Sequence, residues 1–168
     1  MNTHRVQGLA LILGAVCTLS TFIPSDSPLF GFINIIGILL FIFGIPAIHA
    51  SQPSGSIGLI GIVLIVLAAV IALGFRVGIF GGTNFDDSLI ATSVFSALAG
   101  RLIVGWLTIK KRVFSQWIGW AFIAEGLINL GGFLDLAALA SLISVVVTLA
   151  GASAQFGYGI HIVRETRS

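Results

Sequence analysis

Two charged side chains, Arg101 and Glu125, lie within stretches of sequence that carry no other charge. Arg101 belongs to the stretch 88–109 and Glu125 to the stretch 114–131, and the basic triplet 110–112 separates the two. A guanidinium and a carboxylate in such positions can pair with each other, hold a polar solute or relay protons. Which of these they do depends on the elements that position them.

The composition indicates that most of the chain lies in a membrane. Of its 168 residues, 57% are hydrophobic and only 8% are charged, whereas roughly 25% of the residues in an average soluble domain are charged. A membrane-spanning helix needs about 20 mostly apolar residues, so the chain has room for six of them. We therefore expect an all-α integral membrane protein, a six-helix transmembrane bundle that forms one domain over residues 1–168.

Turn-forming or charged residues divide the chain into six apolar segments. The predicted spans are about 6–23, 29–48, 56–75, 88–109, 114–131 and 136–160. Pro46 lacks a backbone N–H and is expected to kink or end the second helix. The third segment has no polar side chain between Ser56 and Arg76, so we expect it to face lipid.

Lysine and arginine are distributed unevenly between the two ends of these segments. With the N-terminus inside, the outer side carries only Arg76, and the inner side carries Arg5, Lys110, Lys111, Arg112, Arg164 and Arg167. Cytoplasmic loops of multi-pass proteins are enriched in these residues. We therefore expect a multi-pass protein of the cell membrane with both termini in the cytoplasm. The basic residues are explained by topology, so the lipid bilayer is the expected partner and nucleic acid is not.

Four aromatic side chains with polar atoms fall near the inner ends of the predicted spans. They are Trp106, Trp117, Trp120 and Tyr158. Tryptophan and tyrosine are enriched where a membrane meets water, so we expect all four in an aromatic belt at the cytoplasmic surface.

Helix geometry predicts that Arg101 and Glu125 can meet. At a rise of about 1.5 Å per residue, Arg101 lies roughly 12 Å from the inner end of its helix and Glu125 roughly 16 Å from the start of the next. Helices joined by a short turn are neighbours, and an unpaired charge in a bilayer costs at least about 2.5–3.5 kcal/mol. The pair can be a clamp that fixes helix register, the centre of a polar cavity with Gln155, Asn34 and Asn129, or a contact to another subunit.

Small and hydroxyl side chains recur at helical spacing on one face of the last segment. This face comprises Ser141, Ser144, Thr148, Gly151, Ala152 and Gly159, with Gln155 among them. Small residues let helix backbones approach each other in membranes. We interpret the face as a packing seam, with Gln155 as the argument for a cavity wall instead.

The sequence predicts no metal, no cofactor and no catalytic residue. His49 and His161 are only weak candidates for a metal or haem, because both are predicted at the cytoplasmic surface instead of inside a span. The predicted spans contain no aspartate for an aspartyl dyad and no lysine for a Schiff base. Cys17 is the single cysteine, so an intramolecular disulfide is excluded.

These observations favour a small polytopic membrane protein without enzymatic activity that packs as a homo-oligomer or as an accessory subunit of a membrane complex. The alternative is a small transporter or channel-like protein with a cavity centred on Arg101 and Glu125. A haem-binding or enzymatic membrane protein is a third and weaker hypothesis.

Overall fold

The computed structural model describes residues 2–19, 28–52, 54–79, 87–133 and 140–165, and within these ranges the regular structure is entirely helical. The elements are α1 (Thr3–Leu19), α2 (Pro28–Gly44), α3 (Pro46–Ser51), α4 (Gly55–Arg76), α5 (Asp87–Lys111), α6 (Gln116–Phe133) and α7 (Ala140–Glu165). Since α3 continues α2 after a short break, the described chain forms six helical rods. The predicted all-α class is confirmed. Parts of the first and last predicted spans, 20–23 and 136–139, lie outside the described residues.

The break between α2 and α3 follows from Pro46. The N–H of Ile45 still donates to the carbonyl of Phe41 at 2.9 Å, which keeps the chain helical up to that point. Pro46 has no N–H to continue the ladder, and α3 begins there as a new short helix. The predicted end of the second helix near Pro46 is therefore confirmed.

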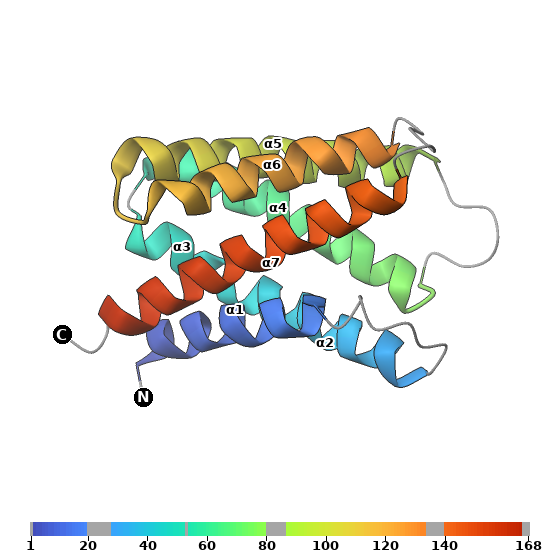
Figure 1. The fold of residues 1–168 in the computed structure, drawn as a ribbon, viewed down its shortest axis with the longest axis horizontal. Helices are drawn as coiled ribbons and strands as arrows, with labels where there is room; N and C mark the ends of the chain where they lie inside the picture. The colour runs from blue at the N-terminus through green and yellow to red at the C-terminus, as the bar shows by residue number, and fades with distance from the viewer. Residues whose placement is uncertain (1, 20–27, 53, 80–86, 134–139, 166–168) are drawn as a thin grey trace.

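The six rods form a ring. Around the ring, α2 packs on α1, α1 on α7, α7 on α6, α6 on α5 and α5 on α4. The ring closes where α4 meets α2, and this seam has the sparsest contacts of the six. Figure 1 shows both chain termini at the same end of the bundle, together with the turn between α5 and α6. We call this the terminal end and the opposite end the distal end.

Glycines bring neighbouring backbones together at four of these contacts. In each case a Cβ added to one glycine would approach the carbonyl oxygen of a glycine on the partner helix, which is the small-residue packing typical of membrane helices. The pairs are Gly8 with Gly159, Gly14 with Gly37, Gly61 with Gly100, and Gly105 with Gly119. The tight crossing of α5 and α6 at the last pair places Arg101 and Glu125 on adjoining helices.

The third predicted span, now α4, is only partly a lipid-facing helix. Leu59, Ile60 and Val63 are exposed, but Ile65 and Ala68 are buried on the opposite face, where α4 packs on α5. The sequence prediction was therefore wrong for half of the helix. Small and branched apolar side chains can pack against a neighbour without any polar group to indicate it.

Helix length and composition indicate a multi-pass membrane protein. Four segments are long and apolar enough to cross a membrane, namely Gly31–Ser51, Gly55–Arg76, Asp87–Lys111 and Val145–Glu165, whereas Thr3–Leu19 is apolar but shorter. Large apolar side chains remain exposed on these helices, among them Phe32, Val63, Phe95 and Leu149. Such an outer surface suits contact with lipid.

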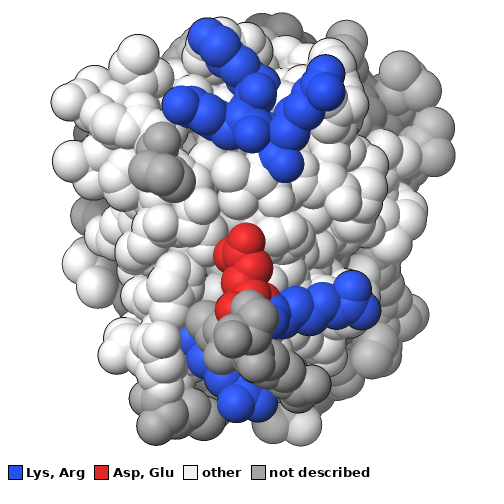
Figure 2. All heavy atoms as spheres, turned by 90° about the vertical axis from the view of Figure 1, so that its left-hand side faces the viewer, with Lys and Arg blue, Asp and Glu red and all other residues white. Residues whose placement is uncertain are grey.

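Basic side chains gather at the terminal end (Figure 2). Lys110 and Lys111 lie in the last turn of α5 and Arg164 in the last turn of α7. The exposed Trp106, Trp117 and Trp120 belong to the helices that meet there, and the ammonium of Lys110 lies 4.6 Å from the Trp106 ring centroid. Arg167 lies outside the described residues.

The packed core occupies the terminal half of the bundle. The cluster of buried apolar side chains includes Ile45, Val104, Phe122 and Ile162 toward the terminal end, and it reaches the cavity at Phe41 and Ile65. The distal half contains the central cavity described below. The bundle is thus closed on one side of Arg101 and Glu125 and hollow on the other.

Candidate functional site

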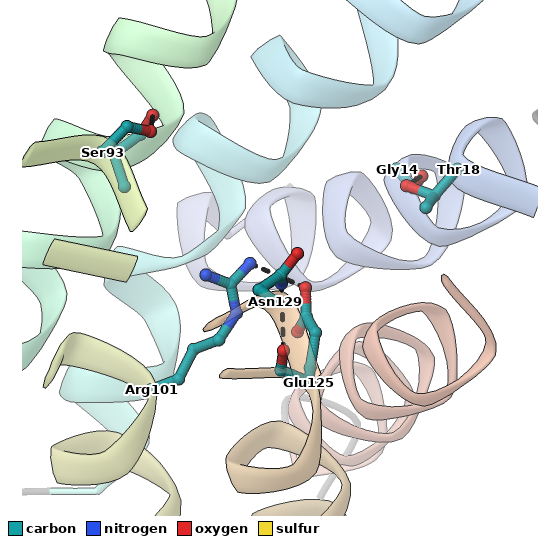
Figure 3. Close-up of polar contacts among 7 residues, drawn as sticks. Gly14, Thr18, Ser93, Arg101, Glu125 and Asn129 are labelled. Carbon is teal, nitrogen blue, oxygen red and sulfur yellow. Dashed lines mark hydrogen bonds and ion pairs between the residues drawn. The ribbon is translucent and has the colours of Figure 1, made fainter. Parts of the chain in front are cut away.

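Arg101 and Glu125 form an ion pair inside the ring, as predicted. The Nη2 atom of Arg101 lies 2.6 Å from Oε1 of Glu125, and the two side chains are only 12% and 9% exposed. Figure 3 shows them reaching toward each other from α5 and α6. Helix rise places Arg101 about 15 Å along α5 from Lys111 and Glu125 about 14 Å along α6 from Gln116. The guanidinium carbon also lies 5.7 Å from the centroid of the Phe122 ring, a favourable cation–π arrangement.

The Glu125 carboxylate rests on the backbone of α7 at Gly151. A Cβ added to Gly151 would lie 2.6 Å from Cδ and 2.7 Å from Oε1 of Glu125, so this position has no room for a side chain while the carboxylate stays in place. The side-chain amide of Asn129 donates to the backbone carbonyl of Glu125 at 2.9 Å (Figure 3). Through Gly151, the ion pair links α5, α6 and α7.

A cavity of about 350 Å³ lies inside the ring, and all six helical rods contribute to its lining. It brings together the five residues that the sequence suggested for a polar cavity, which are Arg101, Glu125, Gln155, Asn34 and Asn129. On α4 the lining runs from Ile65 to Arg76, which corresponds to about 16 Å along the helix. The cavity therefore extends from the ion pair toward the distal end, where Arg76 is exposed.

The cavity has two kinds of wall. Helices α5, α6 and α7 contribute polar groups, namely Ser93, Arg101, Glu125, Asn129, Thr148 and Gln155. Helices α2 and α4 contribute mainly apolar groups, namely Ile38, Phe41, Ile65, Ala68, Ala69 and Ala72, with Asn34 and, at the distal end, Arg76 as polar exceptions. The hydroxyl of Ser93 donates across to the carbonyl of Ala68 at 3.3 Å. The lining is thus amphipathic.

Buried polar atoms at the ion-pair end of the cavity have no hydrogen-bond partner among the described residues. They include Oε2 of Glu125, Oε1 of Gln155 and Nε of Arg101, and both Glu125 and Gln155 are only 6% exposed. Leaving a buried acceptor unsatisfied costs about 1–3 kcal/mol. These atoms have almost no accessible surface, so they lie behind the cavity lining and not on it.

Different residues of the predicted packing face of α7 make different contacts. Gly159 meets α1 at Gly8, and Ala152 is buried. Thr148 lines the cavity, and Gly151 contacts Glu125. The side chains of Ser141 and Ser144 lie outside the described part of the structure.

A buried polar cluster lies in the terminal half of the bundle, and it was not predicted from the sequence. The Thr108 hydroxyl lies 2.7 Å from the hydroxyl of Tyr158, 3.0 Å from Oε1 of Gln52 and 2.9 Å from the carbonyl of Val104. A hydroxyl has one proton, so Thr108 accepts from Tyr158 if it donates to Gln52 or to Val104. This cluster connects the end of α3 to α5 and α7.

Tyr158 was wrongly predicted to lie in the aromatic belt. It is fully buried, because its hydroxyl has a partner in Thr108 and its ring packs edge-on against Phe114 and Phe122, with centroids 4.8 and 5.6 Å away. A signal was present in the sequence, since Tyr158 follows Gln155 by three residues and so continues the polar face of α7.

The two histidine candidates lie on α3 and α7. The Nδ1 atom of His49 lies 3.5 Å from the Ser54 hydroxyl, and Nδ1 of His161 lies 3.5 Å from Oε1 of Glu165. Over the described ranges, no group of three His, Cys, Asp or Glu side chains is arranged to hold a metal ion. A metal ion at either histidine therefore finds no support from a third ligand among the described residues.

Comparison of the chain with protein-family models, with curated proteins and with solved structures found no match. The function must therefore be inferred from the chemistry of the cavity and from its position in the bundle.

Proposed function

We propose that the protein is a small six-span transporter of the cell membrane that binds a solute in the central cavity, with Arg101 and Glu125 at the inner end of the binding site. The observation that carries the proposal is the 350 Å³ cavity, which holds this ion pair. Intramembrane ionisable residues that face a cavity commonly mark substrate or proton pathways. The proposal assigns binding and translocation to the cavity, with no chemical conversion of the solute.

The positions of α1 and α6, which are not among the four long apolar segments, support six spans. Helix α6 packs between α5 and α7, and α1 packs between α2 and α7, so both lie within the same ring as the four long apolar segments. The basic side chains at the terminal end support a cytoplasmic location for both termini. The cavity would then extend toward the outer surface.

The asymmetry of the bundle supports transport by alternating access. The cavity lies on the distal side of the ion pair, and the apolar cluster together with Gln52, Thr108 and Tyr158 fills the terminal side. A transporter holds its substrate near mid-membrane and opens one side at a time. In this account, the cavity extends toward the outer side, and the packed cluster separates it from the inner side.

The same geometry supports a second candidate function, in which Arg101 and Glu125 act only as a structural clamp. The specific observation is the contact of the carboxylate with Gly151, through which the pair fixes three helices. The protein would then pack as a homo-oligomer or as an accessory subunit of a membrane complex. Only the transporter requires water to enter the cavity.

Cysteine accessibility distinguishes the two candidates. In a Cys17→Ala background, Ala97→Cys places a thiol in the cavity lining, whereas Phe95→Cys places one on the exposed outer surface of the same helix. Methanethiosulfonate reagents react with thiolates, which form in water and not in lipid. A water-filled cavity predicts rapid labelling of Ala97→Cys and slow labelling of Phe95→Cys in native membranes. Equal, slow labelling of both would refute the proposal.

A further inference from the structure

Arg112 has a backbone conformation that favours glycine. Its φ angle is 56°, in the left-handed region that residues with a Cβ rarely adopt. Its N–H donates to the carbonyl of Thr108 at 3.2 Å, which is the hydrogen bond that closes a helix in the αL motif. Glycine is the usual residue at this position. Because glycine would end α5 with less strain, the arginine side chain at this position requires an explanation of its own.

Arg112 is the last of three consecutive cations at the terminal end of the bundle. Lys110, Lys111 and Arg112 are all exposed, and among the described residues none of the three forms an ion pair. Glu165 is the described acid at this end (Figure 2), and its carboxylate lies 3.5 Å from Nδ1 of His161. The triplet 110–112 therefore presents positive charge that no described carboxylate neutralises by direct contact.

Phe114 fixes the turn that carries this charge. It is only 2% exposed, and its ring centroid lies 4.8 Å from the centroids of both the Tyr158 and the His161 rings. Residues 112–115 alone connect α5 to α6. A short turn with a buried anchor holds the triplet in place before any ligand arrives, which lowers the entropy that is lost on binding.

Exposed apolar side chains follow α5 from the triplet toward the middle of the bundle. Trp106 is 49% exposed and Phe95 is 52% exposed, and their spacing along the helix places both on the same side as Lys110. The ammonium of Lys110 lies 4.6 Å from the centroid of the Trp106 ring. An anionic group at the triplet thus has apolar protein surface next to it. An acyl chain could bind along that surface, whereas a free phosphate ion could not use it.

From this arrangement we infer that Lys110, Lys111 and Arg112 bind the phosphate of an anionic phospholipid, whose acyl chains lie along the outer face of α5. Lysine and arginine near a membrane surface attract anionic lipids, and a guanidinium forms paired hydrogen bonds with phosphate. Arginine supplies at position 112 a contact that glycine cannot make, and this contact accounts for the unfavourable backbone. The inference is independent of the proposed transporter function, because the triplet lies on the outside of the bundle.

The experiment measures thermal unfolding of the full chain in micelles of a neutral detergent with increasing amounts of phosphatidylglycerol, and with phosphatidylcholine as the reference lipid. Arg112→Gly is compared with Arg164→Ala, because each removes one exposed cation from the terminal end. In phosphatidylcholine, Arg112→Gly should raise the Tm by about 2–4 °C through relief of the backbone, and Arg164→Ala should leave it nearly unchanged. Phosphatidylglycerol should raise the Tm of the wild type. Arg112→Gly should need about fivefold more of this lipid for the same gain, whereas Arg164→Ala should respond like the wild type.

The opposite directions of the two effects of Arg112→Gly make the test specific. A response to phosphatidylglycerol equal to that of the wild type would overturn the site. Equal losses in Arg112→Gly and Arg164→Ala would also overturn it, since the charge would then act diffusely. A lower Tm of Arg112→Gly in phosphatidylcholine would contradict the argument from the backbone.

Two further measurements complete the test. Arg112→Asn, which tolerates the left-handed region without a charge, should lose as much of the response as Arg112→Gly, and an intact response would count against the guanidinium as the ligand group. Inorganic phosphate at the same concentration as the lipid should not raise the Tm of the wild type. An equal gain with inorganic phosphate would overturn the role of the acyl chains and leave a phosphate ion as the ligand.

Discussion

The Nη2 atom of Arg101 lies 2.6 Å from Oε1 of Glu125, and this contact joins two helices at a depth where neither charge could remain unpaired without a large penalty. The second carboxylate oxygen, Oε2, has no hydrogen-bond partner among the described residues and belongs to a residue that lines the cavity. The pair can therefore contribute to stability through this contact, and its two residues also form part of the cavity lining.

Removing one member of the ion pair should destabilise the protein strongly. Either Glu125→Ala or Arg101→Ala leaves a buried charge without its partner, which costs about 3–5 kcal/mol. The double variant removes both charges and should lose less stability than either single variant. Equilibrium unfolding of the four proteins in one mild detergent provides the measurement. Additive losses would show that the two side chains are not energetically coupled.

Gly151→Ala should displace the Glu125 carboxylate. The added Cβ would lie 2.6 Å from Cδ of Glu125, and forcing such a group into a packed site costs about 1–3 kcal/mol. Gly31→Ala is the matched control, because a Cβ at Gly31 has no neighbour within 4 Å; alanine there should be neutral or slightly stabilising. In a Glu125→Ala background the Gly151→Ala penalty should largely disappear. If it persists, the contact with Glu125 is not its cause.

The buried cluster around Thr108 should contribute measurably to stability. Tyr158→Phe keeps the aromatic packing and removes only the hydroxyl 2.7 Å from Thr108, so it should cost about 1 kcal/mol. Thr108→Val removes the shared partner of Gln52 and Tyr158 and should cost more, about 1–3 kcal/mol. After Thr108→Val, the further change Tyr158→Phe should cost little. Thermal unfolding of the single and double variants checks this, and independent losses would count against a connected cluster.

Both termini should lie in the cytoplasm. Ile79 is exposed at the distal end and Ser115 is exposed in the turn between α5 and α6. In the Cys17→Ala protein, Ile79→Cys should react with a membrane-impermeant thiol reagent on intact cells, because the distal end carries few basic residues and should face outward. Ser115→Cys should react only after lysis. The reverse pattern would invert the proposed orientation.

Much of the local structure could be predicted from the sequence, since it depends on neighbouring residues. The missing N–H of Pro46 predicted the break there. The rise of a helix and the short turn between neighbouring helices predicted that Arg101 and Glu125 can meet. Contacts between distant segments could not be predicted in the same way. Nothing in the sequence indicated that Gly151 would receive the Glu125 carboxylate or that α1 would pack on α7, because glycines are compatible with many partners.

Tyr158 illustrates a different limit. A tyrosine near a helix end suits a membrane interface as well as a buried hydrogen bond, and only the position of Thr108 on a neighbouring helix decides between the two. The cavity could be predicted only in part. The polar residues Asn34, Asn129 and Gln155 could be named from helix faces, but the apolar wall of α2 and α4 looked the same as a surface in contact with lipid.

The sidedness of labelling at Ala97→Cys tests the transporter most directly. An impermeant thiol reagent is applied to one side of oriented proteoliposomes at a time, with Ser115→Cys and Ile79→Cys reporting the two faces and Phe95→Cys as the lipid-facing control. Alternating access predicts that Ala97→Cys reacts from both sides, faster from the distal side, to which the described cavity extends. Reaction from the distal side alone would contradict transport and leave a one-sided binding pocket, and reaction from neither side would leave only the structural clamp.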